Sequence, residues 1–141
     1  MKYFRWICVA LALLAALSAY HFIGRDDGEP AAPIRNIGSS TMYTEDEIND
    51  VMDIVERHFD TEFEGCHLTE LIYDEKESNL YCEDWARHYK AGRAIVLLSS
   101  FDVDPSGADV GLNPNSTYAD WQWILTQKDG EEWVLQTWGY G

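Results

Sequence analysis

Apolar residues recur at helical spacing after Thr44, which predicts an amphipathic helix. The motif Thr44-Glu45-Asp46-Glu47 is a capping box, in which the Thr44 hydroxyl and the Glu47 carboxylate satisfy backbone amides at a helix start. Five apolar residues then fall on one face of that helix: Ile48, Val51, Met52, Val55 and Phe59. The helix is therefore expected to cover an apolar surface, and Gly65 offers a place for it to end.

Two strands and a second helix are predicted next along the chain. Residues 66–73 (Cys-His-Leu-Thr-Glu-Leu-Ile-Tyr) are short and mixed enough to form a strand. Ser78 or Asn79 can cap a second amphipathic helix before Gly92. Its apolar stripe comprises Tyr81, Cys82, Trp85, Ala86 and Tyr89. Residues 94–98 are continuously apolar, which is typical of a central strand.

The end of the chain predicts a β-hairpin. Residues 118–127 and 131–138 flank the pair Asp129-Gly130, which suits a two-residue turn. With that turn, three cross-strand pairs are expected: Trp121 with Trp138, Leu125 with Val134, and Ile124 with Leu135. Both faces of the sheet are then partly apolar. The sequence therefore predicts an α+β fold, with two amphipathic helices packed on a curled, mainly antiparallel sheet that ends in a C-terminal hairpin.

The first 24 residues have the order of an export signal, because a basic start (Met1-Lys2-Tyr3-Phe4-Arg5) precedes an apolar run. That run, residues 6–23, is 18 residues long and can just span the hydrocarbon of a membrane. Retention as a single-pass signal-anchor places the C-terminal domain outside the cell membrane, since the basic residues stay inside. The alternative is a signal peptide cleaved near Ser18, which releases a secreted domain.

The rest of the chain divides into a tether and one domain. Residues 25–42 are rich in Gly, Pro, Ala, Ser and charge, and Pro30 and Pro33 prevent a regular helix. We expect this segment to be a flexible tether. The remaining part of the 141-residue chain, 43–141, is long enough to build one hydrophobic core. We expect it to be an acidic extracytoplasmic α+β domain.

The chain is strongly acidic, with 25 Asp and Glu against 10 Lys and Arg, for a net charge of −15. This charge argues against nucleic acid and anionic lipid surfaces as partners. It is explained by solubility outside the cell, or by attraction of cations or of a basic partner. Cys66 and Cys82 are the cysteines of the exported part, and an oxidising compartment permits a disulfide between them. Two free buried thiols are the alternative.

Residues 101–109 imitate the start of a calcium-binding EF-hand loop. The oxygen-bearing side chains of this stretch are Asp102, Asp104, Ser106 and Asp109. Gly107 occupies the sixth place of the pattern, but the twelfth is Asn113 where that loop needs a bidentate Glu, and Pro105 stiffens the segment. The alternative is a solvated connection between strands. Calcium is the one cofactor to which the sequence points, and no other is expected.

Catalytic motifs are scarce. His58, His67 and His88 have no metal-ligand spacing, and neither a phosphate-binding loop nor a nucleophile elbow is present. An enzymatic hypothesis therefore needs a pocket between helix and sheet that holds an acid/base pair, such as His67 with a carboxylate.

Large aromatic residues concentrate near the C-terminus: Trp121, Trp123, Trp133, Trp138 and Tyr140. They could stack on sugar rings or form a groove for a peptide. The alternative is that they form the core, which a small domain needs for stability.

Several segments resemble a group of small exported or lipid-anchored bacterial domains of unassigned function. They are Gly65-Cys66-His67-Leu68-Thr69-Glu70-Leu71, Asn113-Pro114-Asn115-Ser116-Thr117-Tyr118, Trp121-Gln122-Trp123-Ile124-Leu125 and the ending Trp133-Val134-Leu135-Gln136-Thr137-Trp138-Gly139-Tyr140-Gly141. The resemblance implies a Gram-positive type of cell surface. The chain departs from the lipid-anchored pattern, since it lacks the lipid-bearing cysteine. The order of elements is also similar to cystatin-like or nuclear-transport-factor-like α+β cone folds, which does not imply a function.

These observations rank three functions. The first is a membrane-tethered extracytoplasmic interaction module, whose sheet and aromatic residues hold a peptide, a glycan or a partner protein. The second is a small cone-fold enzyme with a pocket between helix and sheet. The third is a calcium-stabilised surface domain.

Overall fold

The computed structural model describes residues 31–106 and 111–140. The chain from Ala32 onward is one compact unit. The expected membrane segment, residues 6–23, and the cleavage point near Ser18 lie outside the described residues. Among the helices that the structure does describe, none is long and apolar enough to cross a membrane.

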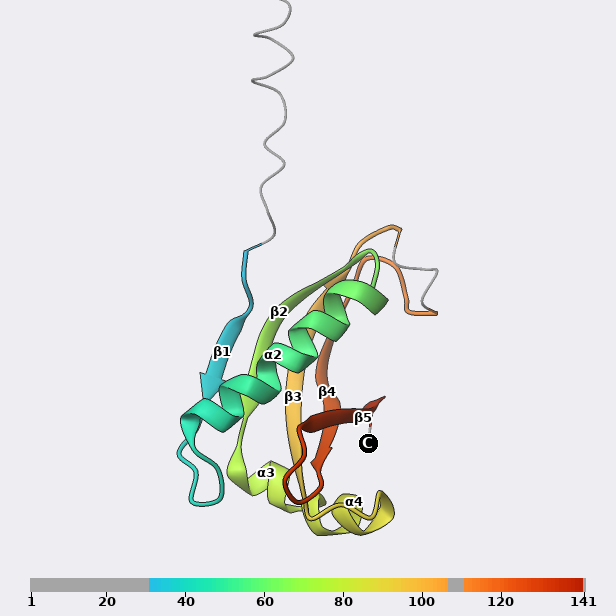
Figure 1. Cartoon of the computed structure of the whole chain (residues 1–141). Helices are drawn as coiled ribbons and strands as arrows, with labels where there is room; N and C mark the ends of the chain where they lie inside the picture. The colour runs from blue at the N-terminus through green and yellow to red at the C-terminus, as the bar shows by residue number, and fades with distance from the viewer. Residues whose placement is uncertain (1–30, 107–110, 141) are drawn as a thin grey trace, which may run out of the picture. The chain divides into compact units, whose positions relative to one another are not determined.

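The fold is α+β, with a five-stranded mixed sheet (Figure 1). Its elements in chain order are β1 Ile34–Ile37, α2 Glu45–Glu62, β2 Cys66–Tyr73, α3 Glu75–Asn79, α4 Cys82–His88, β3 Arg93–Val103, β4 Ser116–Gln127 and β5 Trp133–Gly139. The strands lie side by side in the order of the sequence. The pair β1–β2 is parallel and the other three pairs are antiparallel. The helix α2 lies across one face, and β5 turns over the same face and contacts α2 (Figure 1).

The structure confirms the predicted first helix, both in its N-terminal cap and in its buried face. Thr44 is its N-cap, and the capping box with Glu47 is complete. The five apolar residues predicted for one face are buried. They pack against the inward side chains of the three central strands. These are Leu71, Tyr73, Ile95, Leu97, Phe101, Val103, Trp123 and Leu125. Strand β3 is the middle strand, which confirms the interpretation of residues 94–98.

The second predicted helix is wrong in its extent, because the structure has two short helices, α3 and α4. The first begins earlier than expected, since the side chain of Asp74 accepts a hydrogen bond from Glu77 N. The break falls at Tyr81, whose φ of −132° is not helical. Ser78 and Cys82 are both buried, and Ser78 Oγ accepts a hydrogen bond of 3.0 Å from Val96 N on β3. The two helices thus cover the start of β3 on the face away from α2.

The expected tether is structured in its second half, which corrects the prediction for residues 25–42. Strand β1 pairs with β2, and Arg35 on β1 reaches α2. Its guanidinium donates to Glu56 at 2.8 Å and to Asn49 at 3.0 Å, and it also pairs with Asp53. These contacts join distant parts of the chain, and the composition of a local segment does not reveal them.

The C-terminal hairpin is confirmed, but its predicted register is wrong. Gln127 pairs with Trp133, so five residues connect the strands instead of the expected two. A bulge between Ile124 and Leu125 then shifts the register once more, and Trp138 lies opposite Trp123. A one-residue shift sends a side chain to the other face of a sheet. The consequence is that Leu135, and not the predicted Val134, lies opposite the core residue Leu125.

Candidate functional site

The candidate site is built around the C-terminal end of α2. The helix stops at Phe63, whose backbone N–H donates to Phe59 O at 3.0 Å, and the chain turns at Gly65, which has a φ of 74°. Carboxylates surround this end, at Asp60, Glu62 and Glu64, and the last turn contains no basic residue. A helix C-terminus carries a partial negative charge that Lys or Arg commonly offsets. Here acidic side chains add to that charge.

Aromatic rings form the walls of a pocket beside this helix end. The pocket has a volume of about 430 Å³ and is lined by Glu62, Phe63, Leu112, Trp121 and Trp138. The rings of Phe63 and Trp121 stand at 89° to each other, with their centroids 6.3 Å apart. We call this hollow the aromatic pocket. Its volume is within the range usual for small-molecule sites, about 300 to 1,000 Å³.

The five aromatic residues singled out in the sequence divide into two groups. Trp123 and Trp133 belong to the core, at 0% and 9% exposed. Trp138 and Tyr140 are exposed, at 40% and 61%, and Trp121 is half-buried. The ring of Trp121 contacts Tyr140 at a centroid distance of 5.2 Å. Trp121 and Trp138 line the aromatic pocket, so one part of the predicted set serves the core and another forms a surface.

Two buried side-chain nitrogens, one of them on the pocket-lining Trp121, lack a hydrogen-bond partner within the described part of the chain. They are Trp121 Nε1 and His58 Nε2. His58 lies against Trp138, with ring centroids 4.2 Å apart. Buried polar atoms are nearly always paired with protein or water. Both atoms are shielded from solvent, so they do not by themselves indicate a ligand.

Sequence reasoning missed Glu62, Phe63 and Leu112. A signal for the first two was present, since α2 ends in acidic residues with no Lys or Arg to offset the helix dipole. Leu112 comes to the pocket only through the connection between β3 and β4, which has no periodic pattern.

Two other hollows have different linings. One, of about 510 Å³, lies between α4 and the outer face of β4 and is lined by Tyr81, Asp84, Trp85, His88 and Gln122. The other, of about 640 Å³, is lined by the turn between β1 and α2. In that turn Thr41 donates from its backbone N and its Oγ1 to Glu75. Thr41 in this hollow thus already has its hydrogen-bond partner within the protein.

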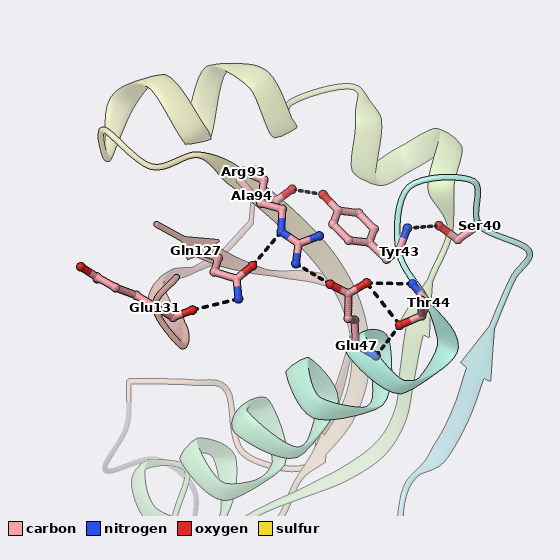
Figure 2. A network of polar contacts seen from close by, with 8 residues as sticks. All are labelled: Ser40, Tyr43, Thr44, Glu47, Arg93, Ala94, Gln127 and Glu131. Atoms are coloured by element: carbon pink, nitrogen blue, oxygen red, sulfur yellow. Dashed lines mark hydrogen bonds and ion pairs between the residues drawn. The ribbon is translucent and has the colours of Figure 1, made fainter. Parts of the chain in front are cut away.

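A network centred on Arg93 joins the start of α2 to the sheet (Figure 2). The guanidinium lies 5.5 Å from the ring centroid of Tyr43 and 5.0 Å from that of Trp133. It pairs with Glu47 and donates to Gln127 Oε1 at 2.7 Å. Hydrogen bonds from the Thr44 backbone and from Arg93 hold the pKa of Glu47 below its usual value. Each of these groups has its partner inside the protein, so the network has a structural role.

The residues proposed for calcium make hydrogen bonds with their neighbours. Asp102 accepts from Thr117 Oγ1 at 2.6 Å, and Asp104 accepts from both N and Oγ of Ser106 at 2.7 Å. Asp109 lies outside the described residues. Within 31–106 and 111–140, no group of three or more His, Cys, Asp or Glu is placed to hold a metal. Calcium binding stays a prediction.

Cys66 and Cys82 are both free thiols in the structure, where Cys82 is buried and Cys66 half-buried. Cys66 opens β2, whereas Cys82 opens α4 and donates to Ser78 O at 2.7 Å. The eight residues of β2 separate these places by about 25 Å of strand. A disulfide needs Cα atoms within about 7 Å. Burial raises the pKa of both thiols, and the charge of Asp104 adds to the effect at Cys66.

His67 has a carboxylate opposite it in the sheet, as the enzymatic hypothesis requires. Its cross-strand partner is Asp102, and both alternate with inward residues, so they face away from α2. Asp102 and Thr117 are exposed on this open strand surface. The pair therefore lies outside any space between helix and sheet, which is where that hypothesis placed its pocket.

No family model, curated protein or solved structure matches the chain. The resemblance to small exported domains and to cone folds therefore stays a prediction.

Proposed function

We propose that this protein is an extracytoplasmic binding module whose ligand site is the aromatic pocket. The observation that carries the proposal is the exposure of Trp138 and Tyr140 next to a pocket with aromatic walls. Large aromatic side chains contribute most to stability when buried. Their exposure around a concave, mostly apolar surface is typical of a site that a ligand covers.

The proposed location follows from the residues before the domain. Residues 6–23 anchor the chain in the cell membrane as a single pass, and the acidic domain lies outside. The part Ile34–Ile37 is fixed to the sheet and to α2 through Arg35, so the tether proper ends before β1. The ligand is a peptide, a glycan or a segment of a partner protein, and nucleic acid is not a partner.

The test is a comparison of variants on arrays of peptides and oligosaccharides. The full chain, carrying a fluorescent label, is applied as wild type, as Trp138→Ala and as Leu80→Ala. Leu80 is the matched control because it is a large apolar residue that is 56% exposed and lies away from the pocket, between α3 and α4.

We expect array elements that bind wild type and Leu80→Ala and lose most of their signal with Trp138→Ala. Binding that is equally strong for all three proteins would place the site elsewhere. An array with no bound element would remove the proposal of a peptide or glycan module.

A further inference from the structure

We propose that the aromatic pocket recognises a lysine side chain presented by a basic partner. This inference rests on the proposed function, because it names the chemical group that the pocket binds. It follows from three features of the molecule: the charge of the helix end, the aromatic and apolar walls of the pocket, and the net charge of the chain.

The charge at the helix end favours a cation. Helix α2 has 18 residues, and its negative end lies at the pocket with Glu62 in the lining. The neighbouring acidic residues Asp60 and Glu64 increase the negative potential. Arg57, the preceding basic residue of α2, lies more than one helical turn upstream. A bound cation therefore supplies the charge that a Lys or Arg in the last turn normally supplies.

The walls favour an ammonium group carried on an apolar chain. Ring faces attract cations at contact distance, and Trp does so most strongly. Trp121 and Trp138 both line the pocket, and Phe63 and Leu112 add apolar surface for a methylene chain. The lysine side chain combines a compact ammonium with four methylene groups. Its stem fits the apolar lining while its head meets Glu62.

The charge of the whole molecule favours the same partner. The chain has a net charge of −15, so it attracts basic molecules over a distance and repels acidic ones. Long-range attraction increases the rate of encounter, and the pocket then provides the specific contact. A lysine on a basic peptide or protein segment satisfies both requirements.

The experiment uses two peptides that differ only in the charged group. One is acetyl-Gly-Lys-Gly-amide, and the other has norleucine in place of lysine and so keeps the apolar stem. Each is titrated into the full chain while the indole N–H signals of the tryptophans are followed by nuclear magnetic resonance. Single Trp→Phe variants assign the signals of Trp85, Trp121 and Trp138.

We expect the lysine peptide to shift the signals of Trp121 and Trp138 and to leave that of Trp85 in place. The norleucine peptide should bind at least about fivefold more weakly, since it lacks the cation–π and ion-pair contributions. Glu62→Gln should weaken the lysine peptide about threefold and leave the norleucine peptide unchanged. Asp50→Asn is the matched control, because it removes the same charge from an exposed place earlier on α2.

Equal affinity for both peptides would overturn the inference, because the pocket would then bind the apolar stem alone. It would leave the binding-module proposal standing. An equal loss in Glu62→Gln and Asp50→Asn would also overturn the inference, since it would assign the effect to net charge. Absence of any shift at Trp121 and Trp138 would remove lysine as the ligand, and the array comparison would then decide the proposed function separately.

Discussion

Replacement of Arg93 by Ala is the most informative test of the fold around α2. Arg93 contacts the ring faces of Tyr43 and Trp133, pairs with Glu47 and donates to Gln127. A cation–π contact at a partly exposed site contributes roughly 0.5–1 kcal/mol. A partly exposed ion pair contributes less than about 1 kcal/mol, and a hydrogen bond roughly 0.5–1.5 kcal/mol. Because these contributions share one side chain, they do not add fully.

We therefore expect Arg93→Ala to lower the free energy of unfolding by about 2 kcal/mol. Urea unfolding of the full chain, followed by circular dichroism, measures this change if the slope with urea stays constant. Arg87→Ala is the control, because Arg87 forms an ion pair with Asp84 at which both side chains are more than 70% exposed (73% and 74%). That pair should contribute at most about 0.5 kcal/mol. Equal losses in the two variants would refute the role given to Arg93.

The same network gives a pH dependence of known sign. The pKa of Glu47 is lower in the folded protein than its usual value, through hydrogen bonds from Thr44 and Arg93. The carboxylate therefore stabilises the fold above the unfolded pKa, and this stabilisation is lost as the pH falls through the folded pKa. Glu47→Gln should be less stable than wild type at neutral pH, and the difference should shrink below about pH 4. A difference that stays constant with pH would contradict the ionic part of the network.

Two further predictions concern the interior. Ser78→Ala removes the hydroxyl that accepts a 3.0 Å hydrogen bond from Val96 N–H. We expect the free energy of unfolding in urea to fall by about 1–3 kcal/mol. A loss below about 0.5 kcal/mol would show that water replaces the hydroxyl. Burial raises the pKa of the Cys66 and Cys82 thiols, so iodoacetamide should alkylate them slowly in the folded chain at neutral pH and rapidly in urea, as read by mass spectrometry. Rapid labelling of the folded chain would contradict that burial.

The elements that the sequence predicted well are those with a strong local signal. Helix α2 combines a capping box with five apolar residues at helical spacing, and the structure reproduces both features. Strand β2 has the predicted bounds 66–73, and β3 contains the continuously apolar residues 94–98. In these segments the local pattern and the tertiary contacts favour the same structure.

The elements that the sequence predicted poorly depend on distant contacts. Strand β1 is four residues long, and its place is set by pairing with β2 and by Arg35 contacts to α2. The hairpin register depends on a longer turn and on a bulge at Ile124, neither of which the Asp129-Gly130 pair indicates. The aromatic pocket could not be predicted from the sequence either, because its lining comes from four separate parts of the chain: the end of α2, the connection between β3 and β4, strand β4 and strand β5.

The central claim is that the aromatic pocket at the end of α2 is the binding site. The most direct measurement is the indole N–H spectrum of the full chain during titration with a ligand selected on the arrays. We predict that the signals of Trp121 and Trp138 shift together in proportion to occupancy, because both line the pocket. A shift confined to Trp85, which lines the hollow beside α4, would contradict the claim and move the site to the opposite face of the sheet.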